Sequence, residues 1–435
     1  MRISVIGCGY LGMVHAAAMA SIGHHVVAVD ISVDKVASLS AGIAPIFEPG
    51  LDELLAEGLS AGRLRFVTDM KAVEPCDIHF LAVGTPQKTA EMSADLNYLH
   101  EAVRELLPHL REGTLVVGKS TVPVGTAKDL ELHINGRGAT LLWNPEFLRE
   151  GWAVSDTLNP DRIVVGTSDP VKAKSHIKKL RSLYSSVPPQ TPFLVTNFAT
   201  AELVKGAANA FLATKISFIN AMAEIADASG ADVTELADAL GHDNRIGRRF
   251  LGAGIGFGGG CLPKDIRAFA ARAEELGKED AVRFLHEVDA INLRRREKAV
   301  ALIDAALQGE VSGRRITILG AAFKPGSDDI RDSPALHAAL RLHELGAQVV
   351  VTDPKAVANA RLAKPQLTYE QDLRRALNGA DAILLATEWA EYREPELAQT
   401  AANLVHQKIV VDGRNCLNVE AWRDQGWRYI GMGRP

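Results

Sequence analysis

The stretch Phe257–Asp265 carries the residues of this chain that are best suited to covalent chemistry. In it Cys261 follows three glycines and precedes a leucine, a proline, a lysine and an aspartate. Glycines lack the Cβ bulk that keeps a substrate away from the backbone, and they reach dihedral angles that other residues avoid. Lys264 and Asp265 add a cation and a potential base near the thiol, an arrangement that activates a cysteine. We therefore predict that Cys261 is a catalytic nucleophile, the alternative being a buried, inert cysteine in a glycine loop.

The composition indicates a globular enzyme. The 435 residues are 47% apolar and 23% charged, which predicts two or three domains with ample core. A net charge of -5 without a basic block argues against nucleic acid or an anionic membrane as a partner. No apolar run approaches the roughly 20 residues of a membrane span, and the first residues run directly into an expected strand, without room for a signal peptide. The four cysteines form no CxxC pair and no cluster has metal spacing, so we expect a cytoplasmic protein with reduced thiols and no metal.

The first thirty residues have the pattern of a dinucleotide-binding unit. An apolar run at 2–6 predicts a strand, the glycine turn Gly7–Gly12 opens a helix, and a second strand over 25–30 ends at Asp30. The glycines allow a tight turn, the approach of a pyrophosphate and close packing of helix on strand, and the helix N-terminus supplies free N–H groups. Asp30 would accept hydrogen bonds from ribose hydroxyls and repel a 2′-phosphate. The pattern predicts an NAD site rather than an NADP site.

Two further strands continue this domain. The apolar runs 78–83 and 115–119 end in the loops 84–86 and 120–126. Ligands of doubly wound sheets lie beyond the carboxyl ends of the strands. We therefore expect both loops to line a site, although either could be only a connection.

A long helix is predicted over 200–229, where small and apolar residues recur at helical spacing without a proline. We expect it to link two domains and to pair with a second subunit. Lys205 and Asn209 are four residues apart and share one helical face. They are almost the only polar residues between Glu202 and Thr214, so we expect them to face a polar site rather than to form a solvated stripe.

A second nucleotide-binding-like half begins near residue 315. Strands are expected over 315–319, 347–353, 382–386 and 408–412, with a helix from the first loop to about Leu345. The first loop, 320–326, lacks the GxGxxG pattern and carries Lys324 instead. Such a loop suits a nucleotide diphosphate other than a second dinucleotide, and a decayed structural copy is the alternative.

Eleven motifs make the chain resemble the UDP-glucose/GDP-mannose dehydrogenase family from end to end, with the greatest likeness to the UDP-glucose branch. These motifs are Gly7–Gly12, Phe47–Leu51, Val83–Pro86, Lys119–Thr126, Asn144–Gly151, Asn159–Gly166, Glu202–Phe211, Arg245–Gly247, Gly256–Asp265, Phe323–Pro334 and Asp412–Asn415. The resemblance implies an α/β fold with two Rossmann-like doubly wound domains, an NAD-binding one over 1–198 and a UDP-binding one over 312–435. Between them it implies a central helical region over 199–300 for dimerisation and the active site.

The resemblance also implies a reaction. The family removes two hydrides in succession from a sugar's primary alcohol with NAD, which here implies oxidation of UDP-glucose to UDP-glucuronate. Cys261 would hold the aldehyde as a thiohemiacetal and the acid as a thioester. The same chemistry on GDP-mannose or an N-acetylated UDP-hexosamine remains an alternative. Two others are a two-electron hydroxy-acid dehydrogenase, which has no use for the thiol, and a regulator that binds NAD without turnover.

Individual site residues follow from the same resemblance. Catalytic roles are implied for Cys261, Lys205, Asp265, Asn209, Thr121, Glu146 and Glu150. NAD contacts are implied for Gly7, Gly9, Tyr10, Leu11, Gly12, Asp30, Lys35, Thr85, Thr121, Glu150, Lys264 and Arg331. Nucleotide-sugar contacts are implied for Glu146, Phe147, Leu148, Arg149, Lys205, Asn209, Arg245, Phe250, Leu251, Gly252, Ala253, Gly254, Gly258 and Lys324.

Some of these residues receive finer roles from the resemblance. Asp265 and Lys205 match residues associated with water activation and with stabilising an oxyanion. Asn209 matches a position near the reacting carbon. Arg245 resembles a residue that reaches across a dimer interface to the ligand, so a homodimer is implied.

The chain departs from the family pattern at four positions. Gly206 stands where many members have tyrosine, Ala221 where glutamate is common, Gly260 where serine is usual and Ser327 where threonine is frequent. None of these changes removes a catalytic group. Gly206 lowers helix propensity by roughly 1 kcal/mol relative to alanine, and Gly206 and Gly260 leave the choice of sugar open.

Overall fold

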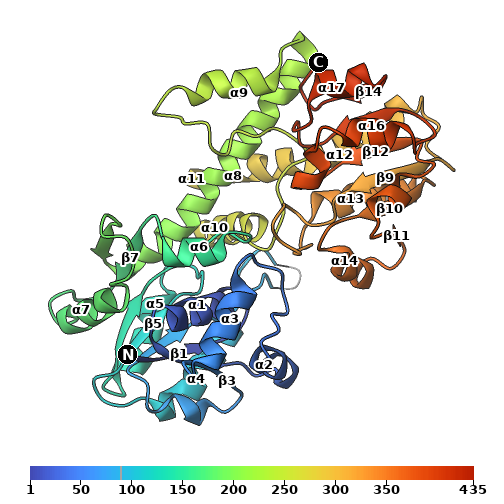
Figure 1. Cartoon of the computed structure of the whole chain (residues 1–435). Helices are drawn as coiled ribbons and strands as arrows, with labels where there is room; N and C mark the ends of the chain where they lie inside the picture. The colour runs from blue at the N-terminus through green and yellow to red at the C-terminus, as the bar shows by residue number, and fades with distance from the viewer. Residues whose placement is uncertain (89–90) are drawn as a thin grey trace. The chain divides into compact units, whose positions relative to one another are not determined.

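The computed structural model describes residues 1–88 and 91–435, which form two compact units (Figure 1). The first unit comprises residues 1–208 with 267–277, and the second comprises 209–266 with 278–435. The helices α8 (Phe198–Ser229) and α10 (Leu262–Glu275) contribute residues to both. No helix in the described ranges is both long and apolar enough to cross a membrane.

The first unit is built on an eight-stranded sheet with the order β3-β2-β1-β4-β5-β6-β7-β8. Its strands are β1 (Arg2–Ile6), β2 (His25–Val29), β3 (Leu64–Val67), β4 (Ile78–Leu81), β5 (Leu115–Gly118), β6 (Thr140–Trp143), β7 (Ile163–Gly166) and β8 (Phe193–Thr196). All neighbours are parallel except β6 and β7. The order of the first six strands is that of a doubly wound dinucleotide-binding sheet, whose ligands lie where the strand order reverses, here between β1 and β4.

Helices cover both faces of this sheet. They are α1 (Tyr10–Ser21), α2 (Val33–Ser40), α3 (Leu51–Ser60), α4 (Asn97–Leu106), α5 (Thr126–Asn135), α6 (Ala153–Leu158) and α7 (Lys174–Leu183). Side chains of α1, α3, α6 and α7 share one core with Ile3 and Val5, and those of α4 and α5 share the other with Ile6. The strands β1, β2, β4 and β5 are buried along almost their whole length and are therefore apolar runs, which the sequence predicts to within two residues.

The second unit contains a six-stranded, all-parallel sheet with the order β11-β10-β9-β12-β13-β14. Its strands are β9 (Arg315–Leu319), β10 (Gln348–Thr352), β11 (Thr368–Tyr369), β12 (Ala382–Leu385), β13 (Ile409–Asp412) and β14 (Arg428–Ile430). Counted from β9, this is again the order 3-2-1-4-5-6. The expected fold class, two Rossmann-like sheets with a helical region between them in the sequence, is therefore confirmed.

The remaining helices of the second unit are α9 (Val233–Gly241), α11 (Glu279–Val282), α12 (Phe284–Ala306), α13 (Pro334–Glu344), α14 (Val357–Ala363), α15 (Leu373–Leu377), α16 (Leu397–Ala402) and α17 (Val419–Asp424). The expected long helix is α8, which begins two residues earlier than predicted. The helix expected directly after the loop 320–326 begins only at Pro334, so that prediction was wrong at its start. Ser333 caps α13 through a bond from the N–H of Leu336, and proline at the first position fixes the start.

Candidate active site

The glycine turn of the first unit forms an open cradle at the N-terminus of α1. A Cβ on Gly12 would collide with the carbonyl oxygen of Gly7, and one on Gly7 would lie 2.8 Å from Val83. These two glycines are therefore required by close packing. A Cβ on Gly9, by contrast, would meet no atom of the described residues within 4 Å. The space in front of Gly9 faces free N–H groups of the helix and fits the pyrophosphate of a dinucleotide.

Asp30 ends the second strand in the position expected for a ribose contact. Its Oδ2 accepts hydrogen bonds from the N–H of Cys8 (2.8 Å) and from Nζ of Lys35 (2.9 Å), and its Oδ1 accepts one from the N–H of Ser32 (3.0 Å). Burial alone would raise the pKa of Asp30, but the bond from Lys35 and the backbone donors hold it below its ordinary value. The carboxylate is therefore ionised, as discrimination against a 2′-phosphate requires.

The loops after β4 and β5 are joined to each other. Thr85 donates a hydrogen bond from Oγ1 to the carbonyl oxygen of Thr121 (2.7 Å), and Ser120 donates one to that of Val83 (2.7 Å). Both loops lie at the carboxyl ends of neighbouring parallel strands. The structure thus brings the predicted residues Thr85 and Thr121 together beside the cradle.

Glu48 is a site residue to which the sequence assigned no role of its own. It is buried, and its carboxylate accepts hydrogen bonds from the hydroxyl of Tyr10 and from the N–H groups of Gly151 (2.6 Å) and Ala153 (2.8 Å). It thereby ties the glycine turn to the segment that carries the predicted residue Glu150, which is also buried. The position of this acid in the turn-forming sequence Phe-Glu-Pro-Gly could have indicated a structural role for Glu48.

An ion pair between the buried Lys119 and the half-buried Glu146 supports the predicted substrate residues Phe147 and Leu148. Nζ of Lys119 lies 2.8 Å from Oε2 of Glu146, while Oε1 accepts hydrogen bonds from the N–H groups of Phe147 (2.8 Å) and Leu148 (3.0 Å). Burial opposes the charge of both groups. The mutual attraction outweighs it, so the pKa of Glu146 lies below and that of Lys119 above its ordinary value. Lys119 was only part of a motif in the sequence, and its burial was not predicted.

Lys205 lies close to Phe147. Its Nζ is 5.8 Å from the ring centroid of Phe147, and the guanidinium of Arg162 lies 3.9 Å from the same centroid. Lys205 and Asn209 are both buried, which excludes a solvated stripe on α8. Arg149 is exposed and is bound by Asp156 through its Nε and Nη2 (2.9 and 2.6 Å).

In the second unit, Asn209, Lys264 and Asp265 form one hydrogen-bonded group. Nδ2 of Asn209 donates to Oδ2 of Asp265 (2.6 Å), and Nζ of Lys264 lies 2.8 Å from Oδ1 of the same carboxylate. The N–H of Asp265 donates to the carbonyl oxygen of Cys261 (2.8 Å), because α10 begins directly after the cysteine. Four predicted residues are thus assembled around one turn of helix.

Cys261 differs from the other cysteines in its exposure. Of the four, all of which lie in the described part of the chain, Cys8 and Cys76 are buried, Cys416 is half-buried and Cys261 is exposed. Burial raises the pKa of Cys8 to about 12 and that of Cys76 to about 11. These thiols are therefore poor nucleophiles, whereas Cys261 is accessible to a substrate.

The glycines before Cys261 are explained by packing within the protein, which corrects the expectation that they merely leave room for substrate. A Cβ on Gly258 would collide with the carbonyl oxygen of Asp332, and one on Gly259 would lie 2.7 Å from the ring of Phe323. At Gly260 a Cβ would collide with the guanidinium of Arg331. Arg331 itself is bound by Asp329 through Nε (2.9 Å) and Nη2 (2.6 Å). The usual serine at position 260 would displace this arginine.

Two polar side chains, the buried Asn292 and the half-buried Arg414, hold the same segment from other elements of the second unit. Asn292 pairs with both polar atoms of the Phe257 backbone, at 2.7 Å to its N–H and 3.0 Å to its carbonyl oxygen. Arg414 donates to the carbonyl oxygens of Ala386 (2.8 Å), Gly256 (2.9 Å) and Phe323 (3.0 Å). Arg414 therefore joins the cysteine segment to two loops at the carboxyl ends of β9 and β12.

The second Rossmann-like sheet uses its strand-ending acid in a different way from the first. The buried carboxylate of Asp353 accepts from the N–H groups of Ala321 (2.8 Å) and Ala322 (3.0 Å) and from Nε1 of Trp389 (3.0 Å). Its other oxygen is bound by two more N–H groups. This acid is committed to the protein, which agrees with a second site for a ligand other than a dinucleotide. Lys324 lies in the loop that Asp353 holds, with Nζ 5.4 Å from the centroid of Phe323.

The remaining predicted substrate residues lie on one loop of the second unit. Leu251 and Ala253 are buried against α8 and α9, and Phe250 has a φ of 66°, a conformation rare for a bulky side chain. Gly252 has open space at its Cβ position within the described residues. Arg245 is 89% exposed and pairs with Asp243 (2.6 Å).

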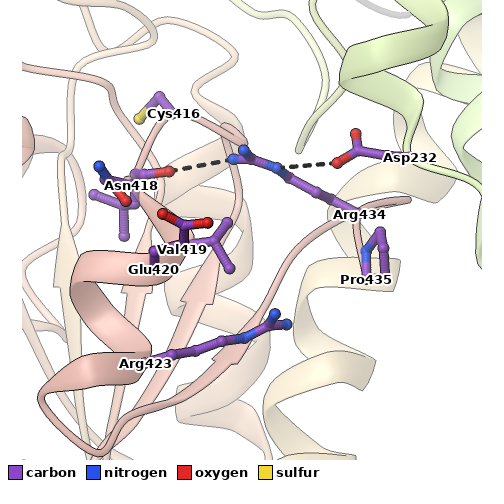
Figure 2. A pocket seen from close by; sticks show the side chains of 9 residues that line it. Asp232, Cys416, Asn418, Val419, Glu420, Arg423, Arg434 and Pro435 are labelled. Atoms are coloured by element: carbon purple, nitrogen blue, oxygen red, sulfur yellow. Dashed lines mark hydrogen bonds and ion pairs between the residues drawn. The ribbon is translucent and has the colours of Figure 1, made fainter.

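A separate hollow lies near the end of the chain (Figure 2). It is lined by Asp232, Cys416, Leu417, Asn418, Val419, Glu420, Arg423, Arg434 and Pro435. Arg434 crosses it, with Nε 3.4 Å from Asp232 and Nη1 donating to the carbonyl oxygen of Leu417 (3.2 Å). None of the predicted site residues lines this hollow.

Comparison with known proteins gives consistent results along the whole chain. Three family models match it: UDP-glucose/GDP-mannose dehydrogenase family, NAD binding domain over residues 1–187, central domain over 199–294, and UDP binding domain over 317–419. The UDP-glucose 6-dehydrogenase of Rhizobium meliloti (strain 1021) is 40% identical over 442 residues, covering 100% of both chains.

Solved structures agree. A UDP-glucose dehydrogenase from the hyperthermophilic archaeon Pyrobaculum islandicum has a TM-score of 0.89 and 40% identity, covering 100% of this chain and 98% of the other. A UDP-D-ManNAc dehydrogenase from Pyrococcus horikoshii has a TM-score of 0.85 and 29% identity, covering 100% and 99%.

Proposed function

Because this chain belongs to the UDP-glucose/GDP-mannose dehydrogenase family, we propose that it oxidises UDP-glucose to UDP-glucuronate with NAD. The single observation that carries the proposal is the exposed thiol of Cys261 at the start of α10, next to the bonded pair Asn209 and Asp265. A two-electron dehydrogenase or a binding module has no need of that thiol. The full-length likeness to UDP-glucose 6-dehydrogenases supports UDP-glucose as the sugar.

NAD is proposed to occupy the cradle of the first unit. Gly7, Gly9, Tyr10, Leu11 and Gly12 would hold the pyrophosphate, Asp30 and Lys35 the adenosine side, and Thr85, Thr121, Glu150, Lys264 and Arg331 would make the other contacts. The open space at Gly9 and the ionised carboxylate of Asp30 support this assignment. When bound, NAD accepts one hydride in each of the two oxidations.

Cys261 is proposed to retain the sugar between these oxidations. The C6 hydroxyl of glucose first loses a proton and C6 loses a hydride, which gives an aldehyde. The thiolate then adds to the carbonyl carbon, forming a C–S bond, and the oxygen takes up a proton. Loss of a second hydride from C6 and of the hydroxyl proton converts this thiohemiacetal into a thioester. Lys205 would stabilise the oxyanion of the addition, and Asn209 would hold the reacting group.

Hydrolysis of the thioester completes the reaction. Water attacks the acyl carbon, the C–S bond breaks, and the carboxylate and the thiol are released. We propose that Asp265 accepts the proton of this water. Its Oδ1 and Oδ2 are held by Lys264 and Asn209, which fixes the carboxylate in one orientation. Thr121, Glu146 and Glu150 are proposed to order the water and to contact substrate or cofactor.

The nucleotide sugar is proposed to contact residues that the sequence already indicated. These are the wall Glu146, Phe147, Leu148 and Arg149, the loop Phe250, Leu251, Gly252, Ala253 and Gly254 with Gly258, and Lys324 of the UDP-binding domain. We propose three domains, an NAD-binding one over 1–198, a central helical one over 199–300 and a UDP-binding one over 312–435.

The reduced state that the chemistry requires of Cys261 supports a cytoplasmic location.

A homodimer is proposed to form through α8. Phe211, Phe218 and Ile225 are 66%, 48% and 59% exposed and are spaced seven residues apart, which places them on one face of the helix. Exposed apolar stripes of this kind mark interaction surfaces. A second copy of this chain is the proposed occupant, because the exposed Arg245 matches a residue that reaches the partner's ligand.

The choice of sugar is tested by turnover of the purified protein on UDP-glucose, GDP-mannose and UDP-N-acetylmannosamine, each with NAD. We expect a kcat/KM for UDP-glucose at least tenfold above the other two, since a single lost polar contact in a pocket costs about that much. A preference for either alternative would contradict the proposed substrate and leave the chemistry in place.

A further inference from the structure

The backbone of Gly254 is held at both its N–H and its carbonyl oxygen by buried side chains of the second unit. Its N–H donates to Oδ1 of Asn220 on α8 (2.9 Å), and its carbonyl oxygen accepts from Nε of Arg295 on α12 (3.0 Å). Asn220 and Arg295 are both 0% exposed. Two helices that are remote from each other in the sequence thus fix one residue of the proposed substrate loop.

This arrangement leaves several donors unused. Nδ2 of Asn220 and both Nη1 and Nη2 of Arg295 are buried and have no hydrogen-bond partner among the residues that the structure describes. Burial lowers the pKa of Arg295, an effect that the charges of Glu224 and Asp227 oppose. Asp227 is already engaged by Lys298 (3.3 Å) and by the N–H of Gly433 (2.8 Å).

Such a residue is a poor choice for stability alone. Buried donors without acceptors oppose folding, and apolar side chains commonly replace buried charges at no loss of stability. Within the described residues, the one acceptor that Arg295 engages is the carbonyl oxygen of Gly254. Arg295 therefore stabilises the position of the loop rather than the packing of α12.

The position of Gly254 is constrained from the opposite side as well. A Cβ there would lie 2.5 Å from the carbonyl oxygen of Gly413, and the next residue, Ile255, donates its N–H to that same oxygen (2.7 Å). Four residues earlier, Phe250 is held at a φ of 66°, a strained conformation that persists only where the surroundings determine it.

We propose that Asn220 and Arg295 are positioning residues for nucleotide-sugar binding, which hold Gly254 so that the loop 250–254 is ordered before the substrate arrives. The inference rests on the proposed function, because it takes this loop to contact the diphosphate and sugar. Neither side chain needs to touch the substrate. They lower the entropic cost of ordering the loop on binding, and this raises the affinity for the nucleotide sugar.

The test compares Arg295→Met with Arg294→Met in the full-length protein. Arg294 is the adjacent residue, and it is exposed and paired with Glu287 (3.0 Å). For Arg295→Met we expect the Kd of UDP-glucose by calorimetry and its KM to rise about tenfold, the effect of losing one charged hydrogen bond. The kcat and the KM for NAD should change less than threefold, and the Tm should stay the same or rise. Arg295→Lys, which can still donate to Gly254, should recover part of the affinity.

Each outcome is decisive. An unchanged Kd in Arg295→Met, or a raised Kd that accompanies a lowered Tm and a loss of kcat, would overturn the positioning role and indicate a structural one. An equal rise in Arg294→Met would also overturn it. A wild-type protein that neither binds nor oxidises UDP-glucose would overturn the proposed function, and this inference with it.

Discussion

The side-chain amide of Asn209 donates a hydrogen bond of 2.6 Å to the carboxylate of Asp265. Asp265 lies in the first turn of α10. The second oxygen of that carboxylate pairs with Lys264 at 2.8 Å. Asp265 is thus held in a fixed orientation four residues after Cys261, where it can accept a proton from a water that attacks the thioester.

Replacing Asp265 by asparagine should separate acyl formation from hydrolysis. The amide keeps the shape but removes the base, so we expect kcat to fall at least about a hundredfold and a covalent adduct to accumulate on Cys261. Intact-mass spectrometry of the protein mixed with UDP-glucose and NAD measures the adduct. Asp280→Asn, the same change at a position whose side chain is 78% exposed, is the matched control and should leave kcat unchanged without an adduct. A lowered kcat in Asp265→Asn without any adduct on Cys261 would contradict this role for Asp265.

The structure explains why residue 206 is a glycine, which the sequence alone did not. A Cβ at this position would lie 2.8 Å from the ring of Phe269, so the aromatic ring occupies the space that a side chain would need. We expect Gly206→Ala to lower the free energy of unfolding by about 1–3 kcal/mol from overpacking, although alanine is the better helix former. Urea denaturation measures it, and Phe269→Leu in the same chain should restore the loss. A stabilised Gly206→Ala protein would show that the ring moves aside freely.

Much of the fold was predictable from the sequence because parallel strands buried on both faces are apolar runs between glycine turns. Four strands of each sheet were predicted in this way, β1, β2, β4 and β5 in the first and β9, β10, β12 and β13 in the second. The start of α13 was missed because the segment after the loop 320–326 is held by side chains, including Ser333 as the cap, rather than by helical periodicity.

The supports of the site were harder to predict than its chemical groups. Glu48, Lys119 and Arg295 act through partners more than twenty-five residues away, and one sequence does not show which residues these partners are. Motif matching found Cys261 and Asp265 because their spacing is local. It also gave a reason for the glycines that the structure corrects, since Asp332, Phe323 and Arg331 fill the space beside them.

His15 should make the protein sensitive to acid. It is fully buried against Phe80, and neither ring nitrogen has a hydrogen-bond partner within the described ranges. Burial, with the charge of Lys119, lowers its pKa to about 3. Between that value and 6.5 the unfolded chain binds a proton that the folded protein does not, so stability falls as the pH falls through this window.

The variant His15→Phe should remove this pH dependence. At pH 4 the buried neutral imidazole lowers the free energy of unfolding by roughly 3 kcal/mol. The urea midpoint of the variant, relative to that of the wild type, should therefore be higher at pH 4 than at pH 7. His133→Gln, at an exposed position, is the control and should leave the pH profile as it is. Parallel profiles for wild type and His15→Phe would contradict the burial of a neutral imidazole.

Phe218→Glu should dissociate the proposed dimer. A charge in the centre of the apolar stripe of α8 must be desolvated at the interface, so we expect the dissociation constant to rise by at least about a hundredfold. Light scattering after size-exclusion chromatography measures the mass. Leu132→Glu on α5, at a position that is 74% exposed, should remain dimeric. A monomeric wild-type protein, or a dimer unaffected by Phe218→Glu, would refute this interface.

The most direct test of the account is the number of NADH molecules formed for each UDP-glucose consumed, measured with the wild-type protein and with Cys261→Ala. We expect two for the wild type, because alcohol and aldehyde are both oxidised before release. We expect no UDP-glucuronate from Cys261→Ala, because the thioester cannot form. A wild-type ratio of one, or undiminished acid formation without the thiol, would contradict a thiol-held four-electron oxidation.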